Sequence, residues 1–372
     1  MSSPISVDTS YLLERLMDML AIPSPTGFTD ELSRYVCEQL TKLNVNFQLT
    51  RRGTIIAHLP GRHSVMARTI ANHLDTIGAT VSELKDNGRL GLEPIGSWSS
   101  RFAEGGRVTI FSRNGSYRGQ VLPVLASGHA FNEQIDALPV DWPYVEVRVN
   151  EPLFSREDLV ELGISTGDIV AFDTDPEVSE SGYISARHLD NKAGAAALLT
   201  AIKKLQDDKL KPEIDFYAVF TITEEVGTGA GASLNENVTE FVGIDIGPVA
   251  PGQNAKETGV TLCAQDTSGP FDYHVLQKLK GICRKYAIDF QVDVYRYYYS
   301  DANSAIKAGH DVREGLITFG TDATHGYERT HMNSLESIVR LIYQYVQSKP
   351  VYPVMGKDVR RMPHTPPYSL EK

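Results

Sequence analysis

Two adjacent carboxylates, Glu224 and Glu225, follow an apolar run and are the clearest candidates for chemistry in the sequence. The preceding residues 214–223 are mostly apolar and β-branched, which is typical of a buried strand in an α/β sheet. Such sheets bind their ligands at the carboxyl ends of strands. Two neighbouring acids are costly to bury unless a cation or a proton compensates their charge. The pair therefore predicts a metal site, with one acid as ligand and the other as general base toward water. A solvated acidic turn is the alternative.

Ligand-type side chains recur where other predicted elements end. They are His73, Asp75, Asp190, Asp245, His325 and His331. Each one alone has an ordinary explanation, because Asp190 suits a helix N-cap, Asp245 suits a turn, and a single histidine suits a loop. Together, histidines and carboxylates suit zinc, cobalt or manganese, and two histidines with three carboxylates are enough for a dinuclear site. Their recurrence at element ends favours such a site.

The elements that must position these residues alternate between helical and strand patterns. Apolar residues at helical spacing indicate helices, and β-branched apolar runs indicate buried strands. This alternation predicts an α/β fold with a sheet between helices. The predicted helices cover 10–20, 29–43, 271–286 and 334–347, with a further one ending near residue 205, and the predicted strands include 67–72, 214–223 and 240–244.

One segment interrupts this alternation and predicts a second domain. Residues 79–166 hold short alternating runs separated by Gly, Pro and Asn, which is typical of a small all-β module. Because the α/β pattern resumes afterwards, we interpret the module as an insertion into one catalytic domain. The predicted domains are 1–78 with 167–348 (catalytic), 79–166 (inserted, β-barrel-like) and 349–372 (proline-rich tail).

Composition narrows the class of protein further. The net charge of −11 over 372 residues argues against nonspecific binding to nucleic acid or anionic membranes. The three cysteines are widely spaced and form no Cys-x-x-Cys pair, so a metal would need histidine and carboxylate ligands. No signal-peptide pattern and no membrane-length apolar run is present, so we expect a cytoplasmic protein.

The ordered set of motifs resembles the tetrahedral dinuclear-metal aminopeptidases, which include the glutamyl and deblocking aminopeptidases. The resemblance covers roughly residues 8–348. The chain is also similar to the subgroup associated with the osmoprotectant N-acetylglutaminylglutamine amide. It implies a zinc-peptidase-like mixed sheet flanked by helices, with an inserted small all-β domain. The matching motifs are His73-x-Asp75-x-x-Gly78, Leu189-Asp190-Asn191, Glu224-Glu225-Val226-Gly227, Asp245-x-Gly247, Ser300-Asp301-Ala302 and Arg329-x-His331.

The resemblance also implies a role for each site residue. Glu224 resembles the general base of the family. Asp75 resembles the carboxylate that orients the ligand His73, and Asp190 resembles the carboxylate that bridges the two ions. The implied activity is hydrolysis of the N-terminal amide bond of small peptides with two divalent ions per chain, zinc first and cobalt or manganese as alternatives. The implied assembly is a homo-oligomer, a dodecamer. The implied metal ligands are His73, Asp190, Glu225, Asp245 and His331.

Two stretches depart from the family pattern. The family motif Pro-x-Arg-Tyr-x-His-Ser-Pro is replaced around Arg329 and His331 by a shorter spacing without the prolines, so His325 is a rival ligand. Motif position favours His331. The run Tyr295–Ser300 predicts either an amphipathic strand with half-buried tyrosines or an aromatic wall of the substrate pocket.

Two other functions and three other reactive residues are compatible with the sequence. An amidase or deacylase for a blocked dipeptide osmolyte would keep the metals, and a catalytically silent scaffold would keep only the fold. His129 and Cys263 are expected to be structural, and Lys192 is expected at a solvated helix start.

Overall fold

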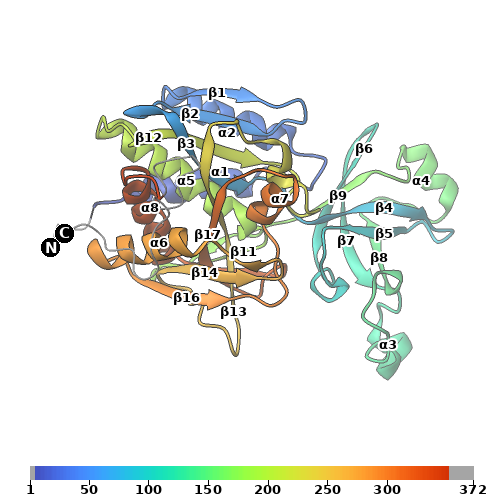
Figure 1. Ribbon diagram of the computed structural model, residues 1–372. Helices are drawn as coiled ribbons and strands as arrows, with labels where there is room; N and C mark the ends of the chain where they lie inside the picture. Colours follow the sequence, from blue (N-terminus) through green and yellow to red (C-terminus); the bar gives the residue numbers. More distant parts are fainter. Residues whose placement is uncertain (1–4, 352–372) are drawn as a thin grey trace.

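A large mixed sheet forms the centre of the protein in the computed structural model, which describes residues 5–351 (Figure 1). Its main path runs in the order β1-β2-β12-β3-β13-β17-β18-β11-β10, and β14, β15 and β16 extend it from β17. The strands are β1 (Asn46–Leu49), β2 (Ile55–Leu59), β3 (His63–His73), β10 (Glu177–Val178), β11 (Tyr183–Ala186), β12 (Ile214–Thr221), β13 (Val238–Val249), β14 (Val260–Asp266), β15 (Gly269–Pro270), β16 (Phe290–Val294), β17 (Arg313–Asp322) and β18 (Glu328–His331).

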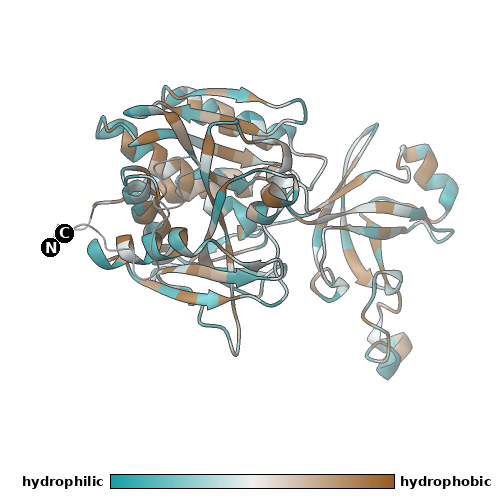
Figure 2. Ribbon diagram, in the orientation of Figure 1, coloured by the Kyte–Doolittle hydropathy of each residue, from teal (hydrophilic) through white to brown (hydrophobic). Residues whose placement is uncertain are grey.

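Helices cover both faces of this sheet, and the alternating strand residues explain why. On β3, Ile70 belongs to a core with the long helices, whereas Ala71 faces a smaller core that contains Ala302 and Ala305. Figure 2 shows hydrophobic residues along the central strands. The helices are α1 (Thr9–Leu20), α2 (Asp30–Lys42), α5 (Leu189–Asp207), α6 (Tyr273–Lys285) and α8 (Met332–Val346) against the larger core, with α7 (Asp301–Lys307) against the smaller one.

Four neighbouring strands are parallel, namely β12, β3, β13 and β17. Their carboxyl ends therefore meet at one edge of the sheet. β12 pairs with β3 so that Thr221 lies opposite His73, and β13 pairs with β3 so that Gly243 lies opposite Ala71. Asp245, two residues beyond Gly243, is therefore level with His73. Parallel pairing thus gathers residues that are far apart in the sequence at the edge where open α/β sheets bind ligands.

A closed antiparallel barrel projects from the α/β domain (Figure 1). The strand β9 closes it by pairing with both β4 and β6. The barrel therefore continues past residue 166, where the predicted insertion ends. Its elements, in the order of the chain, are β4 (Gly78–Leu84), β5 (Leu90–Ile95), β6 (Arg107–Ser112), β7 (Gly115–Pro123), α3 (Gly128–Phe131), β8 (Val145–Val149), α4 (Arg156–Leu162) and β9 (Ile169–Phe172).

The mixed sheet flanked by helices and the small β domain confirm the predicted fold class. The predicted proline-rich tail lies outside the described residues beyond residue 351. Among the described residues, no helix combines the length and the apolar character that crossing a membrane requires.

Candidate active site

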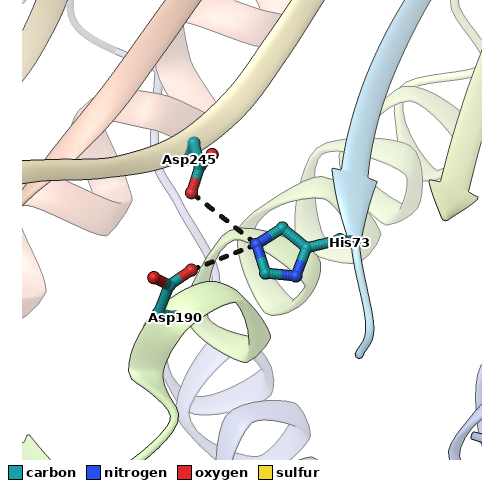
Figure 3. A group of neighbouring side chains, drawn as sticks. All are labelled: His73, Asp190 and Asp245. Atoms are coloured by element: carbon teal, nitrogen blue, oxygen red, sulfur yellow. Dashed lines mark ion pairs between the residues drawn. The ribbon is translucent and has the colours of Figure 1, made fainter. Parts of the chain in front are cut away.

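His73, at the carboxyl end of β3, faces two buried carboxylates (Figure 3). Its Nε2 lies 3.1 Å from Oδ1 of Asp190 and 3.7 Å from Oδ1 of Asp245. Its Nδ1 lies 2.8 Å from the backbone oxygen of Asp75. Because a carbonyl oxygen can only accept, Nδ1 is the donor, and Nε2 of the neutral ring carries the lone pair. The three side chains therefore offer one nitrogen and two oxygen ligands to a common point.

A second group of ligand-type side chains adjoins the first and shares Asp190 with it. Nε2 of His325 lies 3.5 Å from Oδ2 of Asp190 and 3.5 Å from Oε2 of Glu225. Nδ1 of His325 donates to the backbone oxygen of Ser97 at 3.0 Å, so Nε2 again carries the lone pair in the neutral ring. Asp190 turns one carboxylate oxygen toward each histidine, which is the arrangement of a bridging ligand.

The local dihedral angles explain how Asp190 can serve both groups. Asp190 and Asn191 depart from helical geometry at the start of α5, with ψ of 104° and 33°. The Asn191 amide donates to the backbone oxygen of Ile244 at 2.7 Å and to Oδ1 of Asp245 at 3.3 Å. This bend and the hydrogen bonds of Asn191 place the start of α5 against Ile244 and Asp245 in β13.

The electrostatics of the site favour a divalent cation. Burial opposes the charged form of both histidines, but Glu225 and Asp190 raise the pKa of His325 to about 10, and Asp190, Asp245 and Glu224 raise that of His73. Burial, with repulsion from Asp190, raises the pKa of Glu225 to about 8 although His325 opposes the shift. Oε1 of Glu225 is buried and accepts no hydrogen bond within residues 5–351. An unsatisfied carboxylate among other acids fits a metal site.

His331 does not belong to this site, and its predicted role as a ligand is wrong. Nε2 of His331 donates to the backbone oxygen of Ser181 at 2.8 Å. Nδ1 accepts from the backbone nitrogen of Asn333 at 3.0 Å and so caps α8. Both ring nitrogens are therefore engaged away from the carboxylates. The rival candidate His325 takes the position that the sequence assigned to His331.

Asp75 is buried beside the site, but its carboxylate contacts a different partner from the predicted one. Oδ1 accepts from the backbone nitrogen of Glu224 at 3.1 Å, and Oδ2 accepts from that of Glu225 at 3.3 Å and from Thr26 Oγ1 at 2.7 Å. His73 donates to the backbone oxygen of Asp75, whereas the carboxylate is 3.7 Å away. The carboxylate therefore positions the Glu224–Glu225 turn, and the Asp75 backbone orients His73.

Asp301 holds the far end of the same turn. Its Oδ1 accepts from the backbone nitrogen of Ala230 at 2.8 Å, and its Oδ2 accepts from Thr221 Oγ1 at 2.6 Å. A Cβ at Gly229 would lie 1.8 Å from Oδ1 of Asp301, so this approach requires glycine. Burial raises the pKa of Asp301 to about 7. Asp75 and Asp301 thus fix the segment that carries both glutamates.

Glu328 is a positioning residue that sequence reasoning missed. The carboxylate is buried on β18, where Oε2 accepts from the backbone nitrogen of Asp190 at 3.0 Å and Oε1 from that of His325 at 2.9 Å. One side chain therefore holds two ligand-type residues from different elements. No local pattern marks it, because its contact with Asp190 spans 138 residues of sequence.

A cavity of about 700 Å³ opens over these groups. Tyr297, Tyr298 and Tyr299 line it, whereas Tyr295 is buried and pairs with Thr318 through its hydroxyl at 2.8 Å. The strand β16 ends at Val294, before the tyrosines. This arrangement supports the aromatic-wall interpretation of the tyrosine run. The residues of the two ligand groups and the general-base candidate that line the cavity are Asp190, Glu224, Glu225, Asp245 and His325.

Three further residues singled out in the sequence lie elsewhere. His129 is exposed on α3, far along the chain from any site residue, and Cys263 is buried in the smaller core. Lys192 was expected at a solvated helix start, but it is fully buried and its Nζ donates to the backbone oxygen of Ile22 at 2.7 Å. Burial lowers the pKa of Lys192 to about 7. The expectation for Lys192 was therefore wrong.

Comparison with known proteins agrees with this fold. The M42 glutamyl aminopeptidase family model matches residues 53–341, which is most of the chain. An α/β sheet with an inserted barrel, and with histidines and carboxylates gathered at one edge, places the chain among the peptide hydrolases of this family. The protein belongs to the M42 glutamyl aminopeptidase family.

Individual relatives match between about two thirds and nine tenths of the chain. "Putative aminopeptidase YhfE" of Bacillus subtilis (strain 168) is 37% identical over 337 residues, which are 90% of this chain and 97% of that protein. Glutamyl aminopeptidase of Lactococcus lactis subsp. cremoris (strain MG1363) is 25% identical over 247 residues, 64% of this chain and 67% of the relative. Among solved structures, the Pyrococcus horikoshii TET1 peptidase, which can assemble into a tetrahedron or a large octahedral shell, is 23% identical. It has a TM-score of 0.79 and covers 90% of this chain and 99% of its own.

Proposed function

We propose that the protein is an aminopeptidase that binds two divalent metal ions and removes the first residue of small peptides. The carrying observation is that Asp190 directs one oxygen toward His73 and the other toward His325. His73 and Asp245 would complete one metal site, and Glu225 and His325 the other. The donor set of imidazole and carboxylate suits zinc, and also cobalt or manganese.

Bound at these positions, two divalent ions would polarise the scissile carbonyl group and lower the pKa of a water molecule. Glu224 is the general-base candidate, because its Oε2 lies 3.8 Å from Nε2 of His73 and its carboxylate lines the cavity. It would take one proton from water as the water oxygen attacks the carbonyl carbon. It would return that proton to the leaving amine as the C–N bond breaks. Burial raises the pKa of Glu224, which suits a group that must hold this proton.

The turn geometry supports this role for Glu224. Asp75 and Asp301 hold the backbone of the turn at both ends, so the carboxylate is positioned before substrate enters. Pre-positioned groups lower the entropy cost of reaching the transition state. The cavity beside the turn supplies space for a peptide end.

Metal content per chain tests the proposal directly. Elemental analysis of gently purified protein should give about two ions per chain. Chelation should remove them together with peptide hydrolysis, and added zinc or cobalt should restore both. No metal binding at saturating concentration would contradict the proposal and would favour the catalytically silent scaffold.

A substrate pair separates the aminopeptidase from an amidase or deacylase acting on a blocked dipeptide osmolyte. An aminopeptidase should cleave a peptide with a free α-amine and lose that activity when the amine is acetylated. Cleavage of the acetylated peptide alone would favour the amidase. The link to the osmoprotectant subgroup stays a prediction.

The assembly of this chain is also a proposal. We infer a homo-oligomer, with a dodecamer as the expected size, because the TET1 peptidase with the same fold can form a tetrahedron. Light scattering coupled to gel filtration measures the number of chains. The cytoplasmic location stays a prediction from the sequence.

A further inference from the structure

Three consecutive tyrosines form one wall of the cavity over the candidate active site. Tyr297, Tyr298 and Tyr299 line the same hollow as Glu224 and Asp245. Ile246, Pro248 and Val226 add apolar surface to it. Cavities that bind organic ligands are commonly lined by aromatic and apolar side chains with a few polar groups. The tyrosine wall is therefore positioned to contact the part of a substrate next to the reacting bond.

The middle tyrosine is held so that its ring, rather than its hydroxyl, is available to a ligand. The hydroxyl of Tyr298 donates to the backbone oxygen of Ile246 at 2.7 Å. The ring of Tyr298 packs against that of Tyr295, with centroids 4.9 Å apart. Its backbone nitrogen donates to Thr267 Oγ1 at 2.9 Å. The hydroxyl contact joins the wall to Ile246, the residue that follows Asp245.

The two flanking tyrosines differ in freedom. Tyr297 is 92% exposed, so its ring can turn over a bound side chain without losing buried contacts. Tyr299 is partly buried, and Nζ of Lys307 lies 4.2 Å from its ring centroid. The ammonium group of Lys307 occupies that face of the ring and does not line the cavity.

The charges of the cavity offer no partner to a charged substrate side chain. Within the described residues, its lining contains neither lysine nor arginine. Its four carboxylates all belong to the proposed metal ligands and the base: Asp190, Glu224, Glu225 and Asp245. Two divalent cations would balance these four negative charges. With His325 as a metal ligand, an acidic side chain therefore finds no lysine or arginine in this lining, and a basic one finds no free acid.

An adjoining cavity is lined by an arginine that could favour an acidic substrate. This cavity of about 620 Å³ shares Pro248, Tyr297 and Tyr298 with the first, and Arg296 lines it. Arg296 does not line the cavity over the metal ligands. Tyr297 and Tyr298 are common walls of the two cavities. A carboxylate would thus have to extend past the tyrosines to reach the guanidinium group.

We propose that the tyrosine wall selects peptides whose first residue has a large uncharged side chain, aromatic above all. This inference rests on the proposed aminopeptidase function and specifies its substrate class. The first side chain would pack against the ring of Tyr298, and Tyr297 would close over it. Aromatic pairs of this kind gain affinity beyond the burial of apolar area.

The test compares aminoacyl p-nitroanilides with Phe, Leu, Ala, Glu and Lys on the metal-loaded protein. We expect kcat/KM for the Phe substrate to exceed that for the Glu and Lys substrates at least about tenfold. Tyr297→Ala should lower kcat/KM for Phe by about two- to tenfold, mainly through KM, and lower that for the Ala substrate less. Because Tyr297 is almost fully exposed, this variant should fold.

Two control variants separate the wall from its surroundings. Tyr273→Ala removes a tyrosine that is 42% exposed at the start of α6, and it should change no substrate. Arg296→Ala should also leave the Phe and Glu rates unchanged. Calorimetric titration of the Glu224→Gln variant with free phenylalanine and free glutamate measures selection without turnover, and phenylalanine should bind more tightly.

The outcomes also separate this inference from the function on which it rests. Equal rates for all side chains, or a preference for Glu that Arg296→Ala abolishes, would overturn the inference while leaving the aminopeptidase intact. Absence of hydrolysis for every substrate by protein that holds its metals would overturn both. A Phe preference that Tyr297→Ala leaves unchanged would show that this tyrosine does not select the substrate.

Discussion

The carboxylate of Asp75 accepts a hydrogen bond from the backbone nitrogen of Glu224 at 3.1 Å. It also accepts from the next backbone nitrogen, that of Glu225. Both glutamates therefore take their position from one buried acid on the neighbouring strand end. The relationship assigns Asp75 to the turn of the base, whereas His73 is oriented by a carbonyl oxygen.

Asp75→Asn tests this assignment. The amide keeps one acceptor oxygen and the backbone contact to His73, but its NH₂ group would face the backbone nitrogen of either Glu224 or Glu225. We expect kcat to fall about 10- to 100-fold, the usual scale for partners of metal ligands and catalytic groups, with the His73 site still loaded. Elemental analysis beside the rate measurement checks this. Selective loss of the metal held by His73 would instead support the orientation of His73 by the carboxylate.

Glu224→Gln tests the general base. The amide has nearly the same shape but cannot take a proton, so turnover should fall at least about 10²-fold while metal content stays close to that of the parent protein. Glu224→Asp serves as the control, because it keeps the chemistry and shifts the carboxylate. Near-parental turnover in the glutamine variant would refute the role.

The two histidines near the end of the chain form a matched pair of tests. His325→Ala should lose one metal ion per chain and most activity, because His325 Nε2 faces Asp190 and Glu225. His331→Ala should keep both ions and lower the free energy of unfolding by about 1 kcal/mol, since it removes the cap of α8. Metal analysis and denaturant unfolding distinguish them. The reverse pattern would restore His331 as the ligand.

Asp190→Ala tests the shared ligand. Removing one side chain should weaken both metal sites at once, so the purified variant should hold clearly fewer than two ions and be inactive. Asp173→Ala, which removes an acid outside the site that pairs with Arg118, is the control. Full retention of two ions in the Asp190 variant would exclude a bridging role.

Glu328→Gln tests the positioning residue that binds two backbone nitrogens. An amide can still accept with its oxygen, but its NH₂ group would face the nitrogen of either Asp190 or His325. We expect metal affinity to fall about 10- to 100-fold. Titration with zinc in the presence of a competing chelator measures this affinity. A zinc affinity equal to that of the parent protein would show that Glu328 does not position the metal ligands.

Residues at strand ends were predictable, because parallel pairing brings carboxyl ends to one edge whatever the details of packing. Of the predicted ligands, His73 ends β3 and Glu225 follows β12. Asp245 lies within β13 and Asp190 at the start of α5, and they join the same two groups. The choice between His325 and His331 was not predictable from motif order. It depends on the direction in which each imidazole ring points. The ring of His325, before β18, donates to the backbone oxygen of Ser97. The ring of His331, at the end of β18, donates to that of Ser181.

Long-range contacts account for the other differences between prediction and structure. The contact of Glu328 with Asp190 joins segments that show no common pattern, so it is visible only in the folded chain. Burial of Lys192 depends on the backbone oxygen of Ile22, 170 residues away. The barrel ends later in the sequence than predicted, because β9 pairs with the barrel strands β4 and β6. The short apolar run of β9 does not reveal these partners.

The hydrogen bond between Ser97 and His325 has a consequence for the modularity of the protein. Ser97 lies in the inserted segment just after β5, whereas His325 belongs to the α/β domain. The insertion therefore supplies the acceptor that sets the tautomer of His325, a candidate ligand in the other domain. An α/β domain excised from its barrel would lack this acceptor even if it folded. A chimera with a barrel from a relative would keep this contact only if a backbone carbonyl lies at the same point beside His325.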